Sequence, residues 1–131
     1  MKAETIKKLD DFIKIQNKNV SKKNEYNGII SIFPADYKEF LDMYNGGSGS
    51  VGENSYLQLW AFEDIDELNK DYEVVEFLSN IVLIGSDGGD TAYGINQKGE
   101  FVEVPFIGMD DEEVKVVAVR FDDFIEYIYN K

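Results

Sequence analysis

The chain has 131 residues, of which 44% are hydrophobic, and its formal net charge is −13 at pH 7. This length and composition predict one globular domain over residues 1–131, and no apolar stretch approaches the ~20 residues that a membrane-spanning helix needs. The charged N-terminal segment is not followed by an apolar core, so no secretion signal is expected. The absence of cysteine excludes disulfides and fits a cytoplasmic protein.

The sequence contains neither cysteine nor histidine. This excludes Ser-His-Asp and Cys-His catalysis and argues against a zinc site. Carboxylate chemistry, oxygen-ligated Mg²⁺ or Ca²⁺, and plain binding remain open. Glycoside hydrolases use a pair of carboxylates, but a chain with 26 acidic residues contains close carboxylate pairs by chance. Such a pair is therefore no evidence for a hydrolase. The sequence thus gives no specific support for an enzyme, a cofactor site or a metal site.

Charge is distributed unevenly along the chain. Residues 1–33 carry a net charge of +3, whereas residues 34–131 carry −16. A negative field of this size repels nucleic acid and anionic membranes and steers basic partners toward the protein. The simpler interpretation, in which the acids only keep the protein in solution, stays open.

The N-terminal segment is predicted to begin with a helix. Apolar residues at helical spacing indicate a helix over residues 4–17. Residues 20–27 are polar and predict a loop, and residues 28–33 form either a strand or an extended segment.

A second helix is expected to begin at Pro34, where the fixed φ of proline costs least. Tyr37, Phe40 and Leu41 belong to its apolar stripe. We expect residues 45–47, Asn-Gly-Gly, to cap the end of this helix, and residues 48–55 to be a flexible connection.

Residues 56–62 alternate large and smaller groups, as is typical of a strand. Residues 63–69 predict a short acidic helix. Residues 71–79 fit either a helix or a loop, and three of their side chains are expected to be largely buried: Tyr72, Val75 and Phe77.

The centre of the fold is predicted to be a hairpin. The uninterrupted apolar run of residues 81–84 is typical of a strand covered on both faces. The glycines and aspartates of residues 85–90 allow the chain to reverse, with Asp87 and Asp90 capping the turn, and residues 91–95 form the returning strand.

The C-terminal third is predicted to complete the sheet. Residues 100–105 form the next strand of a meander, residues 109–113 form an acidic loop, and residues 114–119 form another strand. Residues 121–129 then carry the strongest helical pattern in the chain.

Two motifs resemble ligand sites but lack the required context. Residues 47–52 match G-x-G-x-x-G, yet a dinucleotide site needs a strand before the motif and a helix after it. Here a helix is expected before it and a strand after it, so we interpret it as a loop. Asp64 and Asp66 begin a D-x-D pattern, but Leu68 and Val75 stand where a Ca²⁺ loop needs oxygen ligands.

The order of several short motifs resembles the SUKH superfamily, which includes fungal cell-wall synthesis regulators and bacterial immunity proteins. Residues 33–41 followed by residues 45–47 are similar to its "LP-x-x-Y-x-x-F-L … NGG" opening. Residues 59–72 are similar to its Leu-Trp strand, "E-x-I" helix and "N-x-x-Y". Residues 84–90 resemble its "IGSDGGGD" turn, and residues 121–125 its closing helix.

This resemblance implies an α+β fold with a central, mostly antiparallel sheet flanked by helices. It also implies a non-enzymatic immunity (antitoxin) protein that neutralises a cognate polymorphic toxin, with a basic nuclease domain as the expected partner. The alternative is a protein-binding regulatory or scaffold module. The candidate toxin contacts are acidic: Glu63, Asp64, Asp66, Glu67, Asp110, Asp111, Glu112 and Glu113.

Overall fold

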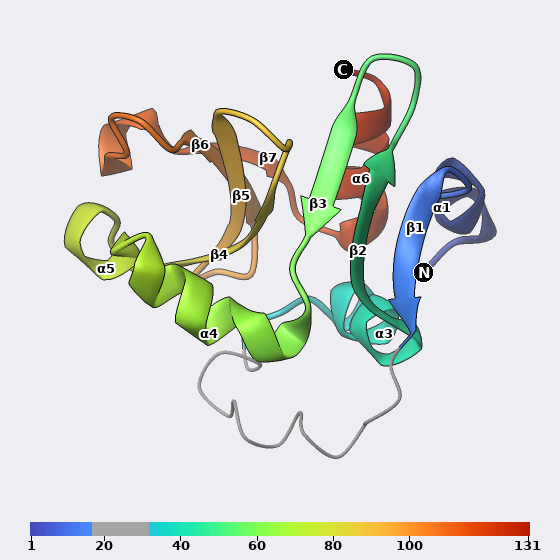
Figure 1. Cartoon of the computed structure of the whole chain (residues 1–131), viewed down its shortest axis with the longest axis horizontal. Coiled ribbons are helices and arrows are strands. Elements are labelled where there is room, and N and C mark those ends of the chain that lie inside the picture. Colours follow the sequence, from blue (N-terminus) through green and yellow to red (C-terminus); the bar gives the residue numbers. More distant parts are fainter. Residues whose placement is uncertain (17–31) are drawn as a thin grey trace.

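The computed structural model describes residues 1–16 and 32–131 (Figure 1). Across these residues a seven-stranded sheet forms, in which each strand pairs antiparallel with its neighbours in the chain. The expected α+β fold with an antiparallel sheet is confirmed. In chain order the strands are β1 (Phe12–Gln16), β2 (Tyr44–Ser50), β3 (Tyr56–Leu59), β4 (Ile81–Ser86), β5 (Thr91–Asn96), β6 (Phe101–Pro105) and β7 (Lys115–Ala118).

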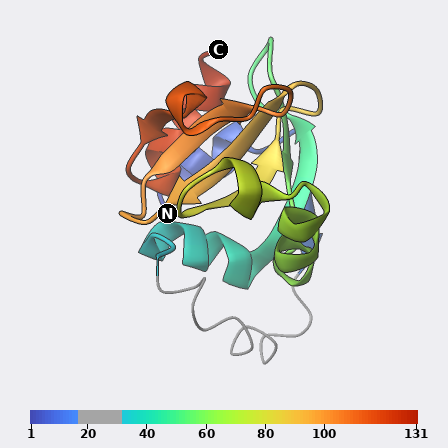
Figure 2. The same ribbon diagram turned by 90° about the vertical axis from the view of Figure 1, so that its left-hand side faces the viewer.

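Helices lie on both sides of the sheet (Figures 1 and 2). They are α1 (Ala3–Lys8), α3 (Ala35–Met43), α4 (Phe62–Asp71), α5 (Val74–Phe77) and α6 (Phe121–Tyr129), with a 3-10 turn η2 (Asp111–Glu113). Helices α1 and α6 contact each other on one face of the sheet, and α4 and α5 contact β4 from the other side. Within residues 1–16 and 32–131, no helix combines the length and apolar character that crossing a bilayer requires.

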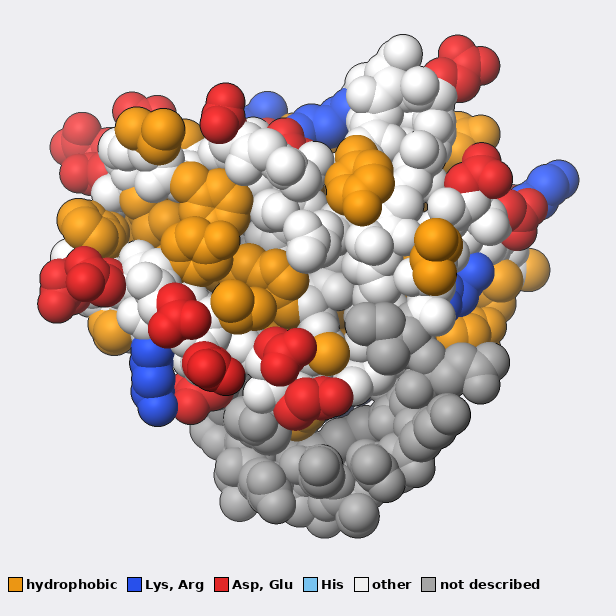
Figure 3. Space-filling view, viewed as in Figure 1, with side chains coloured by type: hydrophobic (Ala, Val, Ile, Leu, Met, Phe, Trp, Pro, Cys, Tyr) orange, Lys and Arg blue, Asp and Glu red, His pale blue; other side chains and the backbone are white. Residues whose placement is uncertain are grey.

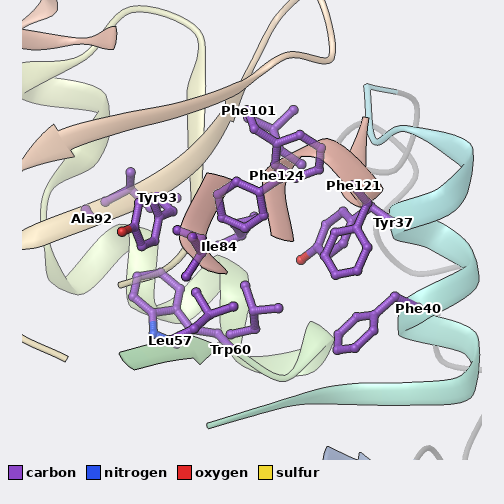
Figure 4. Close-up of a cluster of buried hydrophobic side chains, with 14 of the residues drawn as sticks. Tyr37, Phe40, Leu57, Trp60, Ile84, Ala92, Tyr93, Phe101, Phe121 and Phe124 are labelled. Carbon is purple, nitrogen blue, oxygen red and sulfur yellow. The ribbon is translucent and has the colours of Figure 1, made fainter. Parts of the chain in front are cut away.

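Aromatic side chains from α3, β6 and α6 fill the main core (Figure 4). The ring of Phe101 stacks on Phe124 with centroids 4.7 Å apart, and Phe121 lies 4.8 Å from Phe40 and 5.5 Å from Tyr37. All five side chains are fully buried. Burying each ring stabilises the fold by about 2–3 kcal/mol, so this cluster holds α3 and α6 against the sheet.

The central hairpin is confirmed. Leu83 and Ile84 are fully buried, and β4 continues into the turn that precedes β5. The Oδ1 of Asp87 accepts hydrogen bonds from the backbone N–H groups of Gly89 (2.8 Å) and Thr91 (3.2 Å), which is the turn-capping role expected for this aspartate. The predicted final helix corresponds to α6, and residues 100–105 and 114–119 contain β6 and β7.

The predicted helix over residues 4–17 is wrong. Helix α1 ends at Lys8, and the chain then forms the edge strand β1, in which Ile13 is 77% exposed. Pairing with β2 outweighs the local helical pattern, because propensity is only a weak preference when tertiary contacts compete with it. The expectations for residues 20–27 and 28–31 lie outside the described residues.

The segment after α3 is a strand where a helix cap was expected. Of the connection predicted over residues 48–55, only residues 51–55 link two strands. The backbone turns extended at Tyr44, and residues 44–50 form β2. Here glycine allows close approach: a Cβ on Gly47 would lie 2.3 Å from the carbonyl oxygen of Ile13. Residues 47–50 of the G-x-G-x-x-G motif therefore lie in β2 and not in a loop. The strand expected after the motif is β3.

Residues 71–79 contain the end of α4 and the short α5, and their burial was predicted wrongly. In this segment the side chains of Val74 and Leu78 are the buried apolar ones. Tyr72, Val75 and Phe77 are instead 44%, 87% and 50% exposed. The predicted strand over residues 56–62 is shorter, because α4 already begins at Phe62.

Gly85 should be intolerant of any side chain. A Cβ at this position would lie 2.1 Å from the carbonyl oxygen of Gln58, because β3 and β4 pair closely there. We expect Gly85→Ala to lower the free energy of unfolding by about 1–3 kcal/mol, measured by chemical denaturation. Gly89→Ala is the matched control, since its Cβ would make only an ordinary 3.5 Å contact. Equal stability of the two variants would contradict this account.

The hydroxyl group of Tyr37 is buried and has no hydrogen-bond partner in the described part of the chain. Burial also raises the pKa of this phenol far above its ordinary value. An unpaired buried polar group costs about 1–3 kcal/mol, so Tyr37→Phe should keep the fold and raise the free energy of unfolding. Calorimetry or denaturant unfolding measures the change, and a clear destabilisation would show that the hydroxyl has a partner.

Candidate functional site

One face of the first four strands carries a row of mostly polar side chains. The strand register aligns Ile13, Ser48, Gln58 and Ser86 across β1, β2, β3 and β4. Because side chains alternate along a strand, the buried Leu57 and Leu59 point toward the core, and Gln58 between them points away from it. This row forms the floor of a groove.

Helix α4 forms the wall of this groove. Asp64, Leu68 and Tyr72 follow one another at four-residue intervals and therefore lie along one side of the helix. The groove between α4 and the strands has a volume of about 390 Å³. Among the described residues that line it, Asp64 is the only charged one.

Asn45 anchors the start of α4. Its Oδ1 accepts a hydrogen bond from the backbone N–H of Phe62 (2.8 Å), and its Nδ2 donates to Oε2 of Glu63 (2.6 Å). Since the first N–H groups of a helix have no partner within the helix, this side chain from β2 caps α4. Asn45 was expected to end the preceding helix, but the structure gives it this different role.

Asn69 anchors the other end of α4 to the sheet. Its Nδ2 donates to the carbonyl oxygen of Leu83 (2.8 Å), and its Oδ1 accepts from the N–H of Leu83 (2.8 Å). The pairing of β4 with β5 shifts register between Leu83 and Gly85, as in a β-bulge. Asn69 thus satisfies the backbone of the strand where the regular ladder is interrupted.

An aromatic patch of Trp60, Tyr72 and Phe106 lies at the end of the groove. Tyr72 stacks on Trp60 with ring centroids 5.9 Å apart and an angle of 6° between the planes, and it lies 4.8 Å from Phe106. Trp60 is only 7% exposed, whereas the neighbouring Ile107 is 85% exposed. Figure 3 shows hydrophobic side chains gathered over this region, with acidic groups around them.

The four acidic candidates on α4 have different surroundings. Asp64 faces the groove, and Glu63 is bonded to Asn45. The carboxylate of Asp66 lies 3.1 Å from Nζ of Lys70, one helical turn away, and Glu67 is exposed.

The second acidic segment follows β6 and contains η2. Asp110 caps η2 by accepting a hydrogen bond from the N–H of Glu112 (2.8 Å). Asp111 accepts from both the N–H and the hydroxyl of Ser79 (2.8 Å each), which ties this loop to the segment after α5. Glu112 and Glu113 are exposed. The two acidic segments thus stand on different elements, α4 and the η2 loop, and do not form one cluster.

Sequence reasoning missed the groove because its parts are far apart in the chain. Ser48, Gln58 and Ser86 meet only through the strand register, and Tyr72 was placed in the core. The spacing of Asp64, Leu68 and Tyr72 was the one signal available in the sequence. In the described part of the chain, no group of three or more acidic side chains is arranged to hold a metal ion.

These features define an α+β protein with a groove that carries hydrogen-bonding groups, an aromatic wall and one carboxylate. Residues 11–127 match the SMI1 / KNR4 family (SUKH-1), and the chain belongs to this family. No curated protein matches the chain. The family match confirms the resemblance to the SUKH superfamily. Domains of this family are known as non-catalytic immunity proteins and SMI1/KNR4-like regulators.

The carboxyl group of Asp111 should titrate at unusually low pH. The two hydrogen bonds from Ser79 favour its ionised form and hold its pKa below the ordinary value of 3.8. The stability they contribute is therefore present above the pKa of the unfolded chain and is lost as the pH falls through the folded pKa. We expect Ser79→Ala to raise the pKa of Asp111, measured by carboxyl-carbon NMR. Ser50→Ala, on the exposed end of β2, serves as the control and should leave it unchanged.

Proposed function

We propose that this protein is a non-enzymatic immunity protein that binds a cognate protein toxin and neutralises it, with a basic nuclease domain as the partner. The observation that carries the proposal is the acidic helix α4 beside an open groove, in a chain of the SMI1 / KNR4 family. Residues 62–77 contain seven acidic residues and a single lysine. Such a surface is complementary to the cationic cleft that binds nucleic acid.

Neutralisation would follow from occupancy of that cleft. Carboxylates on α4 take the place of phosphates, and the bound protein excludes the nucleic acid sterically. Attraction between the net charge of −13 and a basic toxin also speeds association, most strongly at low salt. No catalytic group of this chain is needed for such a mechanism.

The direct test uses a toxin-like C-terminal nuclease domain from a neighbouring reading frame. It is calorimetric titration of this protein with that domain, at low and raised salt, together with a nucleic-acid cleavage assay. Tight binding that weakens with salt and abolishes cleavage supports the proposal. A toxin domain that is active and does not bind would contradict it.

Charge reversal should show which acidic segment contacts the toxin. The variants Asp64→Lys/Glu67→Lys on α4, Glu112→Lys/Glu113→Lys on the η2 loop and Asp123→Lys/Glu126→Lys on α6 change the net charge equally. We expect the α4 variant to slow association about 10-fold at low salt in stopped-flow experiments, with a smaller salt dependence. The α6 variant is the control, since its carboxylates are exposed on a helix behind the sheet. Equal slowing in all three would indicate that only net charge matters.

The family also supports a second role, as a regulatory or scaffold module that binds a cellular protein. In that case the same groove and aromatic patch would bind a host partner instead of a toxin. A neighbouring reading frame with a secretion leader and a C-terminal nuclease domain favours immunity, and a cell-envelope operon favours the regulatory role.

A further inference from the structure

The groove beside α4 has the chemistry of a pocket for one cationic side chain. Asp64 lies in its wall and has no ion pair within residues 1–16 and 32–131, whereas Asp66 on the same helix is paired with Lys70. On the floor, Gln58 and Ser48 offer further hydrogen-bond acceptors. A cation in the groove would therefore meet one carboxylate together with neutral acceptors.

The apolar wall of the groove favours arginine over lysine. Leu68 and Tyr72 lie on the same side of α4 as Asp64, so a long aliphatic stem can pack along them while its end reaches the carboxylate. A guanidinium group is planar and has five donors, which suits a carboxylate with an amide oxygen nearby. Anionic ligands are disfavoured by the seven acids of residues 62–77.

The groove is also held rigid before any partner arrives. Tyr72 is fixed between its ring contacts with Trp60 and Phe106, and the backbone N–H of Trp60 donates to the carbonyl oxygen of Ile84 (2.9 Å). Asn45 fixes the first turn of α4, which carries Asp64. The aromatic side chains of the groove therefore lose little conformational freedom when a partner binds. A low entropy cost of this kind favours a strong contribution to the binding energy, as in a hot spot.

We propose that this groove binds an arginine side chain of the partner, with the guanidinium group paired to Asp64 and the aliphatic stem packed on Leu68 and Tyr72. The proposal rests on the proposed function, because it names the part of the toxin that the acidic face recognises. The exposed Ile107, which follows Phe106 of the aromatic patch in the chain, would then contact the apolar surroundings of that arginine.

Trp60 allows a test that needs no toxin. It is the only tryptophan of the chain, and it lines the groove, so its fluorescence reports occupancy. The probe is the peptide Ac-Gly-Arg-Gly-NH₂ at low salt, with the neutral isosteric citrulline peptide as control. We expect saturable binding with a Kd of about 1 mM for the arginine peptide and none for citrulline. Asp64→Asn should abolish the response, and Asp66→Asn should leave it unchanged. No saturable response, or an equal response in Asp64→Asn, would overturn the proposal.

Calorimetry with the toxin domain then separates the two proposals. We expect Asp64→Asn and Tyr72→Ala each to weaken toxin binding by about 30-fold, while Asp66→Asn changes it little. If wild-type protein binds the toxin and both groove variants bind equally well, the groove is not the hot spot although the immunity function stands. If the arginine peptide binds but the toxin does not, the groove stands and the immunity function fails. Circular dichroism checks that every variant is folded.

Discussion

The side chains of Asn45 and Asn69 satisfy backbone groups at the two ends of α4, and the position of the groove depends on them. Asn45 reaches from β2 to the N–H of Phe62, and Asn69 reaches from α4 to both backbone groups of Leu83. A buried backbone group without a partner costs about 1–3 kcal/mol, so each amide strongly favours one placement of the helix. The wall formed by Asp64 and Tyr72 is thereby set at a fixed distance from the strands.

The parts of the fold that the sequence predicted well are those with a local signal. The apolar run of residues 81–84, the capped turn after it and the helical pattern of residues 121–129 each determine their own structure within a few residues. In all three cases the hydrophobic period, the turn residues and the final packing agree. The resemblance to a known superfamily added the overall α+β fold, with its mostly antiparallel sheet, which local patterns alone do not determine.

The errors fall where long-range pairing decides the structure. Residues 12–16 have an acceptable helical pattern, and residues 44–50 are rich in glycine and serine, yet they pair with each other as β1 and β2. Residues 44–50 show no strand pattern by themselves, and the short run of residues 12–16 fits a strand as well as a helix. Tyr72 was expected to be largely buried, but its ring stacks on Trp60 at the surface and remains 44% exposed. The groove is lined by residues of β1 and β2 and by Tyr72. Because neither the strand pairing nor the exposure of Tyr72 was predicted, the groove could not be predicted from the sequence.

Charge and shape have separate consequences in this molecule. The acids of α4 and of the η2 loop create a field that attracts any basic protein, and such a field governs association rate more than specificity. Among them, Asp110 and Asp111 also hold the η2 loop in place through Glu112 and Ser79, so part of the acidic sequence is explained by structure alone. Asp64 differs from both, because it stands in a rigid groove next to an aromatic wall and has no cation beside it in the described residues. Under the proposed arginine pocket, discrimination between basic partners would depend on this groove, because a positive charge there would have to match a shape.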